Sequence, residues 1–92
     1  MQYKDKETKE IFDFLMSKFN IDKNQLVNFW DADNCAFGIS NVDKTILIYI
    51  STFQKEVDDY YLEIEYQNEE SQIFENINRL NLVKILQPIL SS

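Results

Sequence analysis

The sequence predicts a single α+β domain in which one antiparallel sheet packs against two helices. Apolar residues recur at helical spacing near both ends of the chain, whereas three consecutive segments in the middle alternate between apolar and polar residues. The chain has 92 residues, which suits one domain, and 45% of them are hydrophobic, which favours a folded core over disorder. We therefore expect residues 1–92 to form one domain with the element order α-β-β-β-α.

An amphipathic helix is predicted over residues 4–19. Its apolar side chains recur at i, i+3, i+4 and i+7, and they are Phe12, Leu15, Met16 and Phe19. Acidic residues lie early in the segment and Lys18 lies late, an order that complements the helix dipole. Residues 23–30 fit two interpretations, a short helical turn or an edge strand.

Three strands are predicted over residues 35–40, 45–53 and 59–66, because side chains alternate between two faces in each. One face of this meander is apolar and should contact the helices; it holds Cys35, Phe37, Ile39, Ile46, Ile48, Ile50, Tyr60, Leu62, Ile64 and Tyr66. The opposite face is mixed, with aromatic, aliphatic and acidic side chains; it holds Leu47, Tyr49, Tyr61, Glu63 and Glu65. Turns between the strands rely on Asp and Asn, since the chain has one Gly and one Pro.

A second helix is predicted over residues 69–87, with a break near Asn81. Two apolar stripes lie on roughly opposite sides of this helix, and the pattern changes phase at Asn81; the first stripe is Ile73, Ile77 and Leu80, and the second is Leu82, Ile85, Leu86 and Ile89. We expect the first stripe to pack on the sheet. For the second stripe, three alternatives remain: a kink that returns it to the core, a dimer or partner face, or a frayed tail. If it is a self-associating face, the residues that form it are Leu82, Leu86 and Ile89.

The acidic charge belongs to one segment of the chain. The net charge is −7, and residues 56–78 carry eight acidic residues and no basic one, whereas the rest carries nine basic and eight acidic residues. Direct binding of nucleic acid is disfavoured, because phosphate contacts need basic side chains. A partner protein with a basic surface is the natural complement, and an apolar partner surface would suit the aromatic residues.

Several kinds of chemistry are disfavoured. The chain has no histidine, which removes the commonest general base, and its single cysteine, Cys35, is expected to be a small core residue. Glu63 and Glu65 point the same way from one strand, but nothing in the sequence supplies the pocket that acid–base catalysis or a metal ion needs. No Gly-rich phosphate loop is present. We therefore predict no enzymatic activity, no metal and no cofactor.

The mixed sheet face is the predicted site of function. Aromatic residues surrounded by charge are typical of interface centres, so Leu47, Tyr49, Tyr61, Glu63 and Glu65 are predicted to contact another protein. Two other interpretations remain, a solvated strand face and a face covered by a second helix. No apolar run approaches the roughly 18 residues of a membrane span, and a cytoplasmic location is expected.

The middle of the chain resembles a known family. From about Ile11 to Tyr66, an amphipathic helix is followed by the strands "NCAFGIS", "KTILIYIS" and "YYLEIEY", in an order similar to that of the small acidic chaperones of type III secretion. The resemblance implies a non-enzymatic homodimer that keeps another protein soluble or secretion-competent. We predict a chaperone- or adaptor-like binding protein. The alternative is a small acidic immunity or inhibitor protein that blocks a basic enzyme, for example one that acts on nucleic acid.

Overall fold

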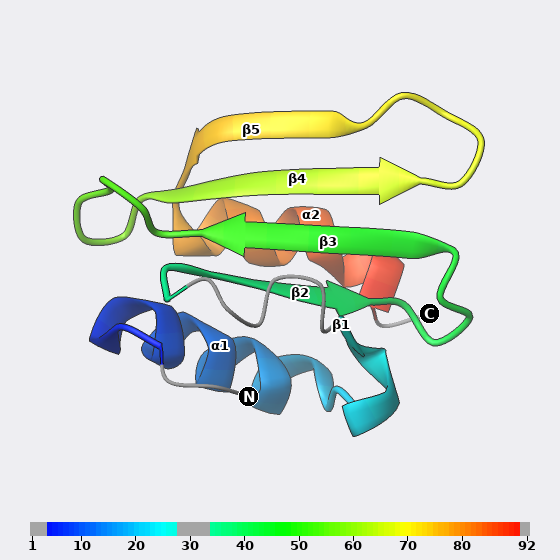
Figure 1. Ribbon diagram of the computed structural model, residues 1–92, viewed down its shortest axis with the longest axis horizontal. Helices are drawn as coiled ribbons and strands as arrows, with labels where there is room; N and C mark the ends of the chain where they lie inside the picture. The colour runs from blue at the N-terminus through cyan, green and yellow to red at the C-terminus, as the bar shows by residue number, and fades with distance from the viewer. Residues whose placement is uncertain (1–3, 28–33, 91–92) are drawn as a thin grey trace.

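Two α-helices and a five-stranded antiparallel sheet make up the fold (Figure 1). The computed structural model describes residues 4–27 and 34–90. Within them the elements are α1 (Lys6–Phe19), the 3-10 helix η1 (Lys23–Gln25), β1 (Leu26–Val27), β2 (Ala36–Ser40), β3 (Ile46–Ser51), β4 (Tyr60–Tyr66), β5 (Gln72–Ile77) and α2 (Arg79–Leu90). The α+β class is confirmed, but the prediction of three strands is wrong. No helix in these residues is both long and apolar enough to cross a membrane.

The strands follow one another across the sheet in the order β1-β2-β3-β4-β5, with every neighbouring pair antiparallel. The three strands predicted from alternation correspond to β2, β3 and β4. Of the ambiguous segment 23–30, the described part forms both predicted structures in turn, η1 and then the edge strand β1, and residues 28–30 lie outside the described residues. A row of Cα partners crosses the sheet on the face predicted to be mixed: Gly38, Tyr49, Glu63 and Ile73.

Both helices bury their apolar sides against the same face of the sheet. Ile11 and Leu15 from α1 share one core cluster with Leu82 and Leu86 from α2, and the exposure of these four side chains is 1% or less. The sheet contributes its inward residues to the same cluster; they are Phe37, Ile39, Ile48, Ile50, Tyr60, Leu62, Ile64 and Ile77. In Figure 1, α2 passes behind β3 and β4, and α1 lies along the β2 side of the sheet. The opposite face of the sheet is therefore free of helices in the described residues.

The predicted helix over residues 69–87 is wrong in its first half, because Gln72–Ile77 forms strand β5. Ile77 is buried, but Ile73 and Leu80 are 54% and 65% exposed, so these three residues do not form a stripe on the sheet. The register explains the error. Tyr60 pairs with Ile77 and Leu62 pairs with Phe74, so two steps along β4 match three steps along β5. This bulge puts Ile73 and Ile77 on opposite faces of the strand although they are four residues apart, so their helix-like spacing does not correspond to a shared face.

The second apolar stripe belongs to the core of the monomer. Leu82 and Leu86 are fully buried, and Ile89 is half-buried and packs against the core. The assignment of these residues to a self-associating face is therefore wrong for Leu82 and Leu86, whose side chains have no surface to offer a partner. The change of phase near Asn81 marks a change from strand to helix three residues earlier, and not a break within a helix.

Two side-chain oxygens cap the N-terminus of α2. Asn78 Oδ1 accepts a hydrogen bond from the Asn81 backbone N–H at 2.9 Å, and Asp58 Oδ1 accepts one from the Arg79 N–H at 2.8 Å. Asn78 thus serves as a helix N-cap, and Asp58 ties the β3–β4 loop (residues 52–59) to the start of the helix.

Replacing the N-cap residue should destabilise the protein measurably. Asn78→Ala removes the acceptor of one helix N–H, so we expect the free energy of unfolding to fall by about 1 kcal/mol. Gln87→Ala, at an exposed position of the same helix, should change it by less than about 0.5 kcal/mol. Urea denaturation of both variants measures the difference. Equal stabilities would contradict the role of Asn78.

Candidate functional site: an outer sheet face and a groove

The uncovered side of the sheet, which we call the outer sheet face, brings all five predicted contact residues together. They are half-buried, and Ile73 of β5 extends the same face; its members are Leu47, Tyr49, Tyr61, Glu63, Glu65 and Ile73. The expectation that a second helix covers this face is not met in the described residues, because both helices pack on the other side. The face is therefore partly exposed on β3, β4 and β5, whereas Ala36, Gly38 and Ser40 on the same side of β2 are buried.

Aromatic and acidic side chains are interleaved on this face. Tyr49 lies directly opposite Glu63, and Leu47 lies opposite Glu65, on the neighbouring strand. The rings of Tyr49 and Tyr61 meet edge to face, with centroids 5.9 Å apart and an angle of 83° between the planes. Tyr61 Oη donates a hydrogen bond to Glu63 Oε1 at 2.9 Å. These contacts hold one carboxylate and two aromatic rings in a fixed arrangement.

β5 adds residues that the sequence analysis did not place on this face. Ile73 is 54% exposed and lies opposite Glu63, so an apolar side chain is presented next to a carboxylate. Lys55 Nζ donates to Asn76 Oδ1 at 2.7 Å and also to the Glu75 carbonyl oxygen, which ties the β3–β4 loop to the bulged end of β5. Only the recognition of β5 as a strand could have revealed Ile73 as part of the face.

The environment of Tyr61 disfavours its ionised form. Burial is the largest cause, and the hydrogen bond to Glu63 and the negative charge of that carboxylate come next; together they raise the pKa of Tyr61 above its ordinary value of 10.0. Tyr49 and Glu75 add smaller effects in the same direction. Tyr61 therefore remains a neutral hydrogen-bond donor to Glu63 throughout the physiological pH range.

Titration of the tyrosines should reveal this coupling. We expect Glu63→Gln to lower the pKa of Tyr61 toward 10.0, because it removes the neighbouring charge, whereas Glu65→Gln should leave it unchanged. Because the pKa of Tyr61 is raised in the folded state, the unfolded state loses this proton first as the pH rises. The contribution of the raised pKa to the stability of the folded state is therefore complete below pH 10.0 and is lost as the pH rises through the folded pKa. Absorbance at the phenolate band, with Tyr61→Phe to identify the signal, measures the shift. An identical curve for Glu63→Gln would contradict the coupling.

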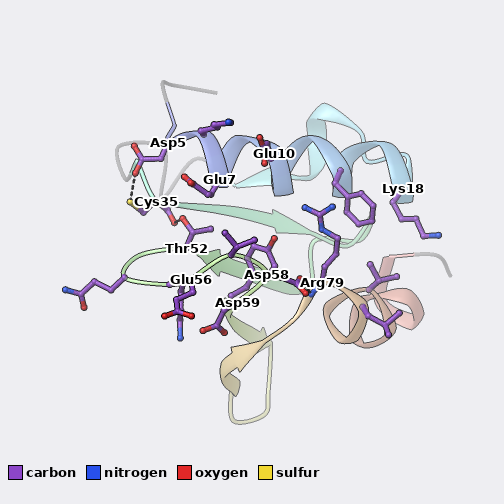
Figure 2. A pocket seen from close by; sticks show the side chains of 18 residues that line it. Asp5, Glu7, Glu10, Lys18, Cys35, Thr52, Glu56, Asp58, Asp59 and Arg79 are labelled. Carbon is purple, nitrogen blue, oxygen red and sulfur yellow. Dashed lines mark hydrogen bonds between the residues drawn. The ribbon is translucent and has the colours of Figure 1, made fainter.

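A groove on the helix side of the sheet is the second candidate site (Figure 2). It has a volume of about 980 Å³ and lies between α1, the β3–β4 loop and the start of α2. One flank of α1 supplies residues at helical spacing, namely Glu7, Glu10, Phe14 and Lys18. The loop turns through two left-handed residues, Gln54 and Asp58, with φ of 56° and 60°. The groove thus has one helical wall and one loop wall.

Cys35 lies at one end of the groove, next to Asp5 (Figure 2). Its thiol donates a hydrogen bond to Asp5 Oδ2 at 3.0 Å. The side chain is half-buried, so its prediction as a core residue is wrong. The described residues hold no group of three or more His, Cys, Asp or Glu side chains that could share a metal ion.

The carboxylates of the groove lie beside apolar surface, an arrangement that is suited to binding cationic groups.

No protein-family model, no curated protein and no solved structure matches the chain. The function must therefore be inferred from the outer sheet face and the groove themselves.

Proposed function

We propose that the protein is a non-enzymatic, chaperone- or adaptor-like binding protein of the cytoplasm that holds another protein on its outer sheet face. The observation that carries this proposal is that one side of the sheet holds an edge-to-face tyrosine pair, a hydrogen-bonded carboxylate, the exposed Ile73 and the half-buried Leu47. Tyrosines are common among the residues that contribute most to interfaces, since they bury a large ring and keep a hydrogen-bonding group.

The partner surface that fits this face is basic. Glu63 accepts a hydrogen bond from Tyr61, and among the described residues neither Glu63 nor Glu65 forms an ion pair; the ion pair present there is Lys9 with Asp13 on α1. An arginine or lysine of the partner can lie over a tyrosine ring while it bonds to a neighbouring carboxylate. The charge of the face therefore selects a basic partner, and the apolar residues supply buried area.

A small acidic inhibitor of a basic enzyme remains the second candidate. The specific observation in its favour is the charge of residues 56–78, because Glu69 and Glu70 in the exposed β4–β5 turn extend the negative surface beyond the sheet. An inhibitor should depend mainly on charge, and its affinity should fall steeply as salt rises. A chaperone-like protein should depend more on Leu47 and Tyr49.

Photo-crosslinking in the native host tests the proposal. A photoreactive amino acid at position 47 lies on the outer sheet face, and the same residue at position 42 is a control in the exposed β2–β3 turn. We expect one discrete adduct from position 47 and none from position 42, and its mass spectrum identifies the partner. Failure of position 47 to give an adduct that position 42 lacks would refute the outer sheet face as the docking site.

A further inference from the structure

We propose that the groove between α1, the β3–β4 loop and α2 is a second binding site, which takes an amphipathic, positively charged peptide segment of a partner protein. The groove lies on the helix side of the sheet, so this site is separate from the outer sheet face. Its occupant follows from two properties of the walls: apolar side chains left in solvent and carboxylates that lack a basic partner.

The apolar part of the groove is partly anchored in the core and partly exposed. Tyr60 belongs to the core, and Phe14 and Val83 are half-buried against it. Val57 at the loop and Leu80 on α2 are 90% and 65% exposed. Two large apolar side chains thus remain in water beside an apolar floor, and an apolar ligand face would gain about 25 cal/mol per Å² by covering them.

Four of the carboxylates that line the groove have no partner among the described residues. Glu7 and Glu10 lie on α1, and Glu56 and Asp59 lie on the loop, on two sides of the groove (Figure 2). Within residues 4–27 and 34–90, none of these side chains makes a hydrogen bond or an ion pair. Their charge is therefore available to lysine or arginine side chains of a ligand.

Two of the basic residues at the groove are already engaged. The Arg79 guanidinium lies over the Phe14 ring, 4.6 Å from its centroid, and Lys55 donates its hydrogen bonds to β5. The stacked Arg79 also shows that the groove accommodates a cation on an aromatic face. With Lys6 and Lys18, the lining of the groove holds four basic residues against six acidic ones, so its net charge is −2.

The alternatives fit the groove less well. A second copy of the chain carries the same net charge of −7, so two copies would repel one another. A small inorganic cation would leave Val57 and Leu80 uncovered. An amphipathic basic segment satisfies both walls, because its apolar face covers these two residues while its lysines reach the carboxylates.

The walls of the groove are held in place before any ligand arrives. Thr8 Oγ1 of α1 and Thr52 Oγ1 of the loop form a hydrogen bond of 2.7 Å, and Asp58 binds the first N–H of α2. The loop is therefore fixed to both helices, which lowers the conformational entropy lost on binding.

Binding of a fluorescein-labelled helical peptide of leucine and lysine, with the leucines on one face, tests the groove. We expect saturable binding at low salt and none by a peptide with glutamate in place of lysine. The double variant Glu7→Lys/Glu10→Lys should raise the Kd at least about tenfold, whereas Glu69→Lys/Glu70→Lys, with the same charge change in a remote exposed turn, should raise it less than about threefold. Equal weakening by both variants, or no binding of the lysine peptide, would overturn the proposal.

Methyl NMR separates this site from the outer sheet face. With the lysine peptide bound, we expect the methyl signals of Val57, Leu80 and Val83 to shift, and those of Leu47 and Ile73 to stay in place. Shifts confined to Leu47 and Ile73 would refute the groove as the peptide site and leave the proposed function intact. Shifts confined to the groove support the present inference whatever the outcome of crosslinking at position 47.

Discussion

Leu86→Ala is expected to lower the free energy of unfolding by about 3 kcal/mol, because Leu86 is fully buried where α2 meets the sheet. For a domain of this size that corresponds to a fall in Tm of about 15 °C. The same substitution at Leu80, which is 65% exposed on the same helix, should cost less than about 0.5 kcal/mol. Thermal and urea denaturation of the two variants measures the difference.

This pair of variants also tests the assignment of the C-terminal apolar stripe. If Leu86 belonged to a self-associating face, its truncation would change the oligomeric mass and leave the unfolding of the monomer little altered. Light scattering on Leu86→Ala distinguishes the two cases. A dissociated oligomer with unchanged monomer stability would contradict the burial of Leu86 within one chain.

Charge reversal on the outer sheet face should weaken binding strongly. For the partner captured through position 47, we expect Glu63→Lys/Glu65→Lys to raise the Kd at least about 100-fold at low salt, because basic partner groups would then face like charge. In a chaperone-like complex, Glu69→Lys/Glu70→Lys, which makes the same change in net charge at the β4–β5 turn, should raise the Kd less than about threefold. Fluorescence anisotropy with the purified partner measures both. Equal effects would contradict a specific role for Glu63 and Glu65.

The same assay distinguishes the two proposed functions. Leu47→Asp should weaken a chaperone-like complex more than the double charge reversal does, because apolar contact then dominates. An inhibitor should show the opposite order, with a steep loss of affinity as salt rises. Neither variant alters a core residue, since Leu47, Glu63 and Glu65 are half-buried on the outer sheet face.

Local alternation was enough to predict β2, β3 and β4. In β3 and β4 it separates a core face from a half-buried face, whereas β2 is buried on both faces and alternates between large and small side chains. β5 escaped prediction for two physical reasons. It is an edge strand whose side chains are mostly exposed, so its apolar face is weakly marked, and its bulge sets Phe74 and Ile77 three residues apart. Because this segment was predicted as a helix, Ile73 was not recognised as a residue of the sheet, and Leu80 was wrongly expected to pack on it.

The two candidate sites differ in how far the sequence could reveal them. Leu47, Tyr49, Tyr61, Glu63 and Glu65 lie on two strands with regular alternation, so their common face follows from the pattern. The groove joins α1, the β3–β4 loop and α2, and no local pattern relates residues so far apart in the chain. Its loop also turns through left-handed Gln54 and Asp58, where no glycine signals the conformation.

The central claim is that the helix-free side of the sheet is where a partner protein binds. Methyl NMR of the protein titrated with the partner captured through position 47 tests it directly. We predict that the Leu47 and Ile73 methyl signals shift or broaden in proportion to the complex formed, while those of the core residues Ile48 and Leu86 do not. Unchanged Leu47 and Ile73 signals at saturating partner would contradict it.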